Sequence, residues 1–191
     1  MSHSNNQPEV DEVLRKIGRN VLNFQRMEAM LKFLIPRLDL QGAATELIAN
    51  NEKVVDVVSR QTMGNLVKGF LSTVYAEKTA DEDTEQNIQE AQFSFSFRIE
   101  ADPEHIAERK KALEHVVKER NILIHQLLLK FDQTSPKSCR EMSEQLDAQA
   151  ERLHPEYEWL RAIIRTFREG SKAALEELEK EFQSNANARH H

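Results

Sequence analysis

The sequence has few of the residues that form cross-links and turns. Its 191 residues include 5 Gly, 5 Pro, 1 Cys, 1 Trp and 2 Tyr. So few Gly and Pro residues argue against a turn-rich β protein and favour long amphipathic helices. The lone Cys139 excludes an intrachain disulfide, so we expect a reducing, cytoplasmic setting.

The sequence also lacks a long apolar run and an excess of positive charge. No apolar stretch is long enough to cross a bilayer, and the polar residues 1–11 do not look like a signal peptide, so we expect no membrane association. The 26 basic residues are outnumbered by 32 acidic ones, which gives a net charge of -6. Because non-specific affinity for DNA comes from phosphate neutralisation, the net negative charge excludes a protein that binds DNA non-specifically over its whole surface, but it permits a local basic patch.

Apolar residues recur at three- and four-residue steps over most of the chain, which is the spacing of amphipathic helices. The charged fraction of 30% and the mean hydropathy of -0.63 fit long helices with one buried face. We therefore predict four long helices and a short fifth one. They span residues 10–35, 45–76, 103–130, 136–169 and 171–182.

Capping residues and helix breakers set the ends of these helices. Asp102-Pro103 and Ser135-Pro136 each place a capping residue before Pro at the first helical position. Pro36 is expected to end the first helix, because Pro lacks the backbone N–H that a helix interior requires. His154-Pro155 is expected to bend or divide the fourth helix, and Gly170-Ser171 to stop it.

Residues 93–99 (Phe-Ser-Phe-Ser-Phe-Arg-Ile) carry the one good strand signal, because large apolar side chains alternate there with polar ones. The sequence does not decide which segment pairs with this strand, and three arrangements of the strand are considered. It pairs with the acidic loop 77–90, pairs with its copy in another subunit, or lies extended over the helices. Residues 39–43 are expected to form a turn, and Asn50-Asn51 is a candidate break in the second helix.

Together these signals predict an all-α fold: an antiparallel four-helix bundle with a short extra C-terminal helix and one short β element. Residues 10–183 are expected to form a single domain, and residues 1–9 and 184–191 to be disordered tails. Whether His190 and His191 are native is left open.

The run from Val117 to Leu128 is strongly apolar but contains Arg120, Asn121 and His125. Burying polar groups without partners costs about 1–3 kcal/mol each, so these three belong to the surface, to a satisfied core network or to a site. On an ideal helix Asn121 and His125 share a face, whereas about 140° separates Arg120 from His125. A two-fold axis nearby would bring two copies of each group into one cleft.

Such a cleft suits RNA cleavage. Histidine transfers protons near neutral pH, and the planar guanidinium of Arg matches phosphate. The 2′-hydroxyl would be the nucleophile, so neither a metal nor another cofactor is required, and Asn121 would fix the His tautomer or donate to phosphate. Flanking phosphates could be held by basic residues on the same helix. These are Arg109, Lys110, Lys111 and Lys118.

The stretch Arg120-Asn121-Ile-Leu-Ile-His125 resembles the Arg-x4-His signature, with Asn after Arg, of the HEPN superfamily (higher eukaryote and prokaryote nucleotide-binding domains). The all-helical layout, with the motif on the third long helix, is similar as well. The resemblance covers residues 11–170. By residue match it assigns site roles to Arg120, Asn121 and His125.

This resemblance implies a homodimer with the motif at its interface. For active members it implies metal-independent endoribonuclease activity in toxin–antitoxin, phage-defence or RNA-processing systems, with a protein partner such as an antitoxin. Members paired with a nucleotidyltransferase antitoxin often carry Tyr two places after the His. Here that place is Leu127, so regulation by modification at this position is in doubt.

Two structural interpretations compete with this hypothesis. The polar residues of the third helix could form a buried network, with Arg120 paired to Glu28 or Glu119. The whole chain could then be a non-catalytic interaction module, which dimerises and presents its acidic loop or its strand to a protein. The Arg109-Lys110-Lys111 run could likewise be an ordinary solvated helix face.

Other candidate sites have simpler explanations. Glu151 and His154 have the spacing of di-metal helical bundles, but exposed helix positions explain them and we expect no metal site. Cys139 has no adjacent His and is expected to be a partly exposed thiol. The Phe row of residues 93–97 could stack nucleic-acid bases, but docking on the bundle or pairing across a dimer explains it better.

Overall fold

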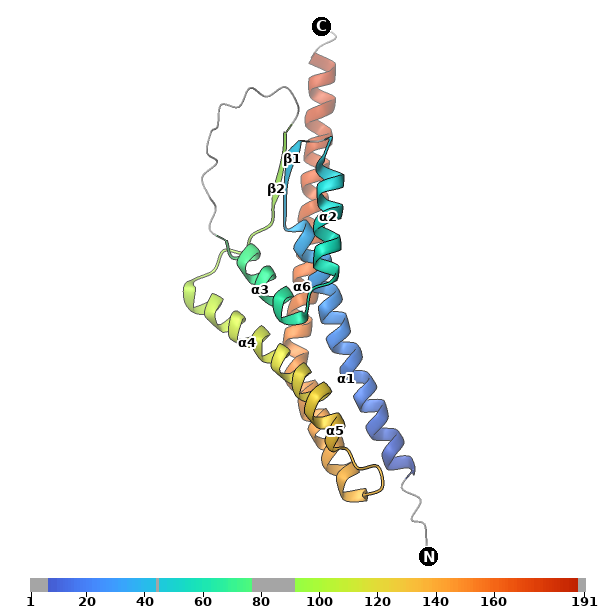
Figure 1. The fold of residues 1–191 in the computed structure, drawn as a ribbon. Coiled ribbons are helices and arrows are strands. Elements are labelled where there is room, and N and C mark those ends of the chain that lie inside the picture. Colours follow the sequence, from blue (N-terminus) through green and yellow to red (C-terminus); the bar gives the residue numbers. More distant parts are fainter. Residues whose placement is uncertain (1–6, 44, 77–91, 189–191) are drawn as a thin grey trace, which may run out of the picture.

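The computed structural model describes residues 7–43, 45–76 and 92–188 and shows an elongated, mostly helical molecule (Figure 1). The elements in chain order are α1 (Gln7–Leu34), the 3-10 turn η1 (Ile35–Arg37), β1 (Asp39–Ala43), α2 (Leu47–Ser59), α3 (Met63–Val74), β2 (Gln92–Ser96), α4 (Pro103–Ile122), the π-helical turn η2 (Leu123–Leu127), α5 (Leu128–Lys130) and α6 (Pro136–Ala188).

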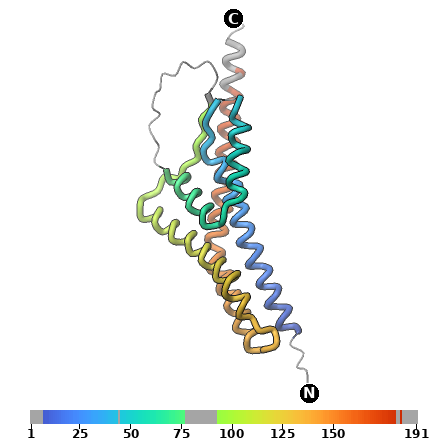
Figure 2. Tube along the Cα trace, in the orientation of Figure 1, coloured from blue at the N-terminus to red at the C-terminus, as the bar shows by residue number. Residues whose placement is uncertain are grey.

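Helix α6 runs along the length of the molecule, and α1 lies beside its first part (Figure 2). They run in the same direction, because the partners of successive α1 residues advance along α6: Lys16 contacts Asp147, and Phe33 contacts Phe167. Each helix buries one stripe of large apolar side chains, and full burial of each such side chain stabilises the fold by about 1.5–3 kcal/mol. The stripes include Val13, Phe24, Met27, Leu31 and Leu34 in α1 and Leu146, Leu153, Leu160, Ile163 and Phe167 in α6.

Helix α4 crosses this pair and runs antiparallel to α6. Arg109 near its start contacts Glu156, and Glu119 near its end contacts Arg152. Helix α3 packs in the angle between α4 and α6. A β-carbon at Gly64 would lie 3.7 Å from a methyl group of Val117, which is an ordinary van der Waals distance, so the contact between α3 and α4 does not depend on glycine there.

The mostly helical fold agrees with the sequence prediction, but the antiparallel four-helix arrangement is wrong for α1 and α6, which run parallel. The predicted second helix, 45–76, is two helices, and the chain turns at residues 60–62 rather than at Asn50-Asn51. Thr62 has an extended backbone, which lets the buried Val58 and Met63 both reach the core from different helices. This extra reversal of direction makes the last helix run parallel to the first.

The predicted turn at 39–43 is also wrong, because these residues form β1, the antiparallel partner of β2. No partner considered from sequence was β1, since Asp39 and Gly42 are unfavourable in strands. Gly42 has φ 142°, a conformation that favours glycine, and it faces Phe93 across the sheet. The expected docking of the Phe row is confirmed, because the Phe95 and Phe97 rings lie 6.1 and 5.7 Å from the Phe167 ring.

The predicted stop at Gly170-Ser171 and the separate fifth helix are wrong, because α6 is one helix of 53 residues. Pro155 lies inside α6 on its exposed side, where the carbonyl that loses its N–H partner can bond water. Gly170 costs about 1 kcal/mol relative to Ala but does not end the helix. Beyond it the leucines of α6 are exposed, Leu175 at 57% and Leu178 at 37%.

The ends of the described helices extend into the predicted disordered tails. Helix α1 begins at Gln7, and α6 continues to Ala188, so residues 7–9 and 184–188 are helical. Residues 1–6 and 189–191 and the whole of the predicted loop 77–90 lie outside the described residues. Within the part of the chain that the structure describes, no helix has both the length and the apolar character needed to cross a membrane.

The predicted helix starts of α4 and α6 are confirmed by their caps. The Asp102 carboxylate accepts a hydrogen bond from the His105 backbone N–H at 2.8 Å. The Ser135 hydroxyl accepts one from the Ser138 N–H at 3.3 Å. These local bonds satisfy backbone donors that a helix start leaves free, which is why the two capping signals were readable from sequence.

Candidate functional site

The predicted site residues lie where α4 passes into the π-helical turn η2. Asn121 and His125 are exposed and Arg120 is partly exposed. In η2 the Leu128 N–H donates to the Leu123 carbonyl, five residues back, instead of the usual four. Such π turns inside α-helices occur often at functional sites, so His125 lies on a backbone feature typical of them.

The η2 turn changes the relative directions of the three side chains. A residue in a π-helical turn advances by less than the 100° of an α-helix. The angle between Arg120 and His125 is therefore smaller than the 140° expected for an ideal helix, and Asn121 and His125 are stacked more closely. Arg120 also donates from Nη1 to Asn121 Oδ1 at 3.3 Å. Arg120 and Asn121 are thus in contact, and the π-helical turn brings the direction of His125 closer to theirs.

The side chain of His125 is exposed to solvent. No hydrogen bond or ion pair joins it to any other described residue. The structural interpretation that pairs Arg120 with Glu28 or Glu119 is wrong within this subunit. Glu28 pairs with Lys32 at 2.7 Å, and the Glu119 carboxylate faces α6, whereas Arg120 points about 100° away from it.

Large apolar side chains are exposed directly after the motif. Leu129 is 82% exposed and Leu128 is 36% exposed. Leu14 and Leu22, on the outer surface of α1, are also about half exposed, at 47% and 51%. Exposed leucines beside free polar groups mark the kind of surface at which a partner commonly binds.

The predicted RNA-binding residues have two different environments. Lys110, Lys111 and Lys118 are exposed along α4. Arg109 is partly buried, because its Nη1 lies 3.2 Å from the Glu156 carboxylate and its guanidinium stacks on the Trp159 ring. The charge of Arg109 is therefore used in holding α4 against α6, and the three lysines remain open to a ligand.

An open groove of about 550 Å³ lies between α4 and α6. Its cationic side comprises Lys111, Lys118 and Arg152, and His115 lies beside them. Three glutamates, at positions 108, 114 and 156, line the same groove and offset much of this charge. The groove is therefore mixed in charge, and a long anionic ligand would meet both attraction and repulsion along it.

Glu119 is the centre of a buried polar network next to this groove. Its carboxylate accepts hydrogen bonds from Gln149 at 2.9 Å and from Arg152 at 2.9 Å, and it lies 3.2 Å from Nε2 of His115. Burial by itself would raise the pKa of the Glu119 carboxyl, but the bonds from Arg152 and Gln149 outweigh burial and hold the pKa below its ordinary value.

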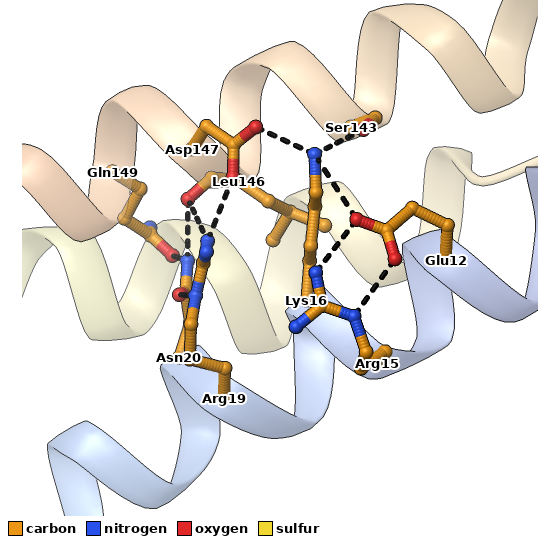
Figure 3. A network of polar contacts seen from close by, with 9 residues as sticks. All are labelled: Glu12, Arg15, Lys16, Arg19, Asn20, Ser143, Leu146, Asp147 and Gln149. Carbon is orange, nitrogen blue, oxygen red and sulfur yellow. Dashed lines mark hydrogen bonds and ion pairs between the residues drawn. The ribbon is translucent and has the colours of Figure 1, made fainter.

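The network continues from Gln149 into α1 (Figure 3). Asn20 is fully buried and donates both to the Leu146 carbonyl at 2.8 Å and to Gln149 Oε1 at 3.0 Å. Lys16 and Arg19 both contact the Asp147 carboxylate, and the hydrogen bond from Lys16 is the main cause that lowers the pKa of Asp147. We call this connected set of polar contacts between α1, α6 and α4 the polar seam.

Sequence reasoning missed most of the polar seam. Asn20, Gln149 and Arg152 are not part of a recognisable sequence motif. Their partners lie at least 30 residues away in sequence. One signal was available, because Glu119 lies in the same apolar run as Arg120 and four residues after His115. A buried acid at such a position requires partners, and the seam supplies them.

The remaining candidate sites were a metal site at Glu151 and His154 and the thiol of Cys139. Within the described residues, no group of three or more His, Cys, Asp or Glu side chains is placed to hold a metal ion. Glu151 and His154 are exposed on α6. The expectation that Cys139 is partly exposed is wrong, because the apolar contacts between α1 and the start of α6 bury it completely.

The chain matches no protein-family model, no curated protein and no solved structure. A functional assignment must therefore be argued from the residues and their geometry.

Proposed function

We propose that this protein is a HEPN-like, dimeric, metal-independent endoribonuclease of the cytoplasm, in a toxin–antitoxin, defence or RNA-processing context. The observation that carries the proposal is the exposed and unpartnered His125 on a π-helical turn, beside Asn121 and Arg120. An imidazole that stabilised the fold would be expected to have a partner within the subunit.

The proposed reaction uses the ribose of the substrate as nucleophile. The 2′-oxygen attacks the adjacent phosphorus, the bond to the 5′-oxygen breaks, and a 2′,3′-cyclic phosphate forms. His125 takes the 2′-hydroxyl proton, and the His125 of a second subunit returns a proton to the leaving 5′-oxygen. Arg120 stabilises the charge that develops on the phosphate, and Asn121 orients the imidazole or donates to phosphate.

The exposed leucines next to the motif support the dimer in this proposal. Leu128 and Leu129 would be covered by the same residues of a second copy, which would place two Arg, two Asn and two His side chains around one cleft. Lys110, Lys111 and Lys118 would bind phosphates outside the cleavage point. Their contribution would weaken with rising salt, because each neutralised phosphate releases counterions.

The test is to incubate the purified full-length chain with total RNA in the presence of a chelator. The proposal predicts cleavage with 2′,3′-cyclic phosphate ends. The variant His125→Ala should abolish cleavage while its melting temperature and dimer state stay unchanged. A matched control is His154→Ala, which removes another exposed helical His on α6 and should leave cleavage intact.

The alternative function is a non-catalytic interaction module, and one observation favours it. Helix α2 buries Val58 but exposes Ile48, Val54 and Val57 at 75%, 44% and 59%. An apolar surface of this kind fits a protein partner such as an antitoxin. RNA that stays intact with the wild-type chain, together with a complex whose affinity falls on Ile48→Glu, would favour this function over the nuclease.

A further inference from the structure

A hollow open to solvent lies away from the proposed nuclease site, at the opposite end of the molecule. It encloses about 760 Å³ between α6, the β1–β2 sheet and the adjoining ends of α1 and α2. This volume falls in the range of roughly 300–1,000 Å³ that is typical of small-molecule sites. Its wall is mainly apolar and aromatic. The principal members are Phe33, Leu40, Phe93, Phe95, Phe167 and Leu175.

The aromatic wall is held in place by its own contacts. The Phe167 ring meets the rings of Phe33 and Phe95 edge to face, each at 6.1 Å between centroids. These contacts join α1, β2 and α6, so the hollow is bounded by three elements that fix one another. Leu175 on its rim is 57% exposed, which leaves apolar surface uncovered.

One arginine without a carboxylate partner, Arg37, lines this hollow, and a second, Arg168, lies over the ring of the lining residue Phe33. The Arg37 and Arg168 guanidinium groups lie 4.6 and 5.5 Å from the centroid of the Phe33 ring. Neither forms an ion pair with a carboxylate of the described residues. Arg37 donates from Nη1 to the Phe33 carbonyl, and its remaining N–H groups are available to a ligand. Two guanidinium groups above an aromatic wall attract an anion with an apolar body.

Two buried polar atoms among the lining residues also lack partners. Asn51 Oδ1 and Ser171 Oγ are inaccessible and have no hydrogen bond to a described residue. A buried polar atom without a partner costs about 1–3 kcal/mol. Because both atoms are inaccessible, a ligand in the hollow can satisfy them only after the side chains rotate toward it. Ser171 can donate to a carboxylate, and a flip of the Asn51 amide presents a donor in place of its oxygen.

We infer that this hollow is a binding site for an amphipathic monocarboxylate, with its acyl or aryl body against the Phe167 wall and its carboxylate at Arg37, and with Arg168 adding positive charge next to the lining residue Phe33. The apolar lining selects the body and the unpaired guanidinium groups select the charge. This site is independent of the proposed ribonuclease activity, because it uses none of the residues of α4 or η2.

The test is calorimetric titration of the full-length chain with decanoate, below its micellar concentration, with decyltrimethylammonium and hexanoate as controls. We expect saturable 1:1 binding of decanoate, and at least tenfold weaker binding of the cation with the same tail and of the shorter acid. Equal affinity for the two head groups, or no saturable binding of decanoate, would overturn the inference.

Variants locate the site. Arg37→Gln with Arg168→Gln should weaken decanoate binding at least tenfold, whereas Arg165→Gln, an exposed Arg of the same helix, should change it less than twofold. Ala174→Trp should fill the hollow and abolish binding while the circular dichroism spectrum stays unchanged. Unchanged decanoate binding in the folded Trp variant would show that the ligand binds elsewhere. If the wild type binds no decanoate and is a dimer, and the Trp variant is a monomer, the hollow is instead the interface with a second copy.

Discussion

Polar side chains on two neighbouring faces of α4 differ in burial and in hydrogen bonding. On the face toward α6, Glu119 is 6% exposed at its side chain and has hydrogen bonds from two residues of α6. On the outer face, Asn121 and His125 are exposed, and the imidazole has no partner among the described residues. The difference separates polar groups that hold the fold together from polar groups that remain available for chemistry. The predictions below test this separation.

The largest effect is expected at Glu119. Glu119→Ala leaves the buried Gln149 amide without its side-chain acceptor and Arg152 without its counter-charge, so the free energy of unfolding should fall by about 3 kcal/mol. Urea denaturation followed by circular dichroism measures this loss. Glu119→Gln, which keeps the shape and one acceptor oxygen, should lose less than half as much, and an equal loss in both variants would show that charge is the sole contribution.

A smaller effect is expected at the α1 end of the polar seam. Asn20→Ala removes the donor that bonds the Leu146 carbonyl and Gln149, so unfolding should become easier by about 2 kcal/mol. The partly exposed neighbour Asn23→Ala, on the same helix, is a suitable comparison in the same urea assay. A loss at Asn20 no greater than at Asn23 would contradict the role of the seam in joining α1 to α6.

The polar seam also predicts how stability depends on pH. The pKa values of Glu119 and Asp147 are lowered in the folded chain, so the stabilisation from their ionised forms is full above the unfolded pKa values of about 4. It is lost as the pH falls through the folded values. Urea midpoints measured from pH 7 down to pH 2.5 should therefore drop below about pH 4, and Glu119→Gln should show a shallower drop than the wild type.

The smallest effect on stability is expected on the outer face of α4. Asn121→Ala removes an exposed side chain whose bond to Arg120 is long, so the free energy of unfolding should change by less than about 0.5 kcal/mol. The same variant should lower RNA cleavage, because the amide orients the imidazole in the proposed mechanism. A loss of stability comparable to that of Asn20→Ala would place Asn121 with the structural residues instead.

The sequence predicted those features that depend on local signals. The caps at Asp102 and Ser135 and the alternating apolar residues of β2 are short-range patterns, and the structure agrees with them. The partner strand β1 was not predictable in this way, because its pairing joins residues 49 to 57 positions apart. The same holds for the parallel direction of α1 and α6, which follows from a turn at residues 60–62 that contains neither Gly nor Pro.

The candidate site was predictable to a similar extent. The polar residues at 120, 121 and 125 stand out within an apolar run, and Asn121 and His125 do share an exposed face. No motif in residues 123–127 predicts the π-helical geometry of η2. The partners of Glu119 were not readable, because they lie on α6, 30 or more residues away in sequence. The seam residues were missed for this reason, although they account for much of the polarity buried between the helices.

The most direct test of the central claim compares His125→Ala with Glu119→Gln in one experiment, with RNA cleavage and urea denaturation measured on the same preparations. The account predicts that His125→Ala abolishes the formation of 2′,3′-cyclic phosphate ends at full stability. It predicts that Glu119→Gln loses stability but retains cleavage at a temperature where it is folded. Cleavage that survives in the folded His125→Ala variant would contradict the account.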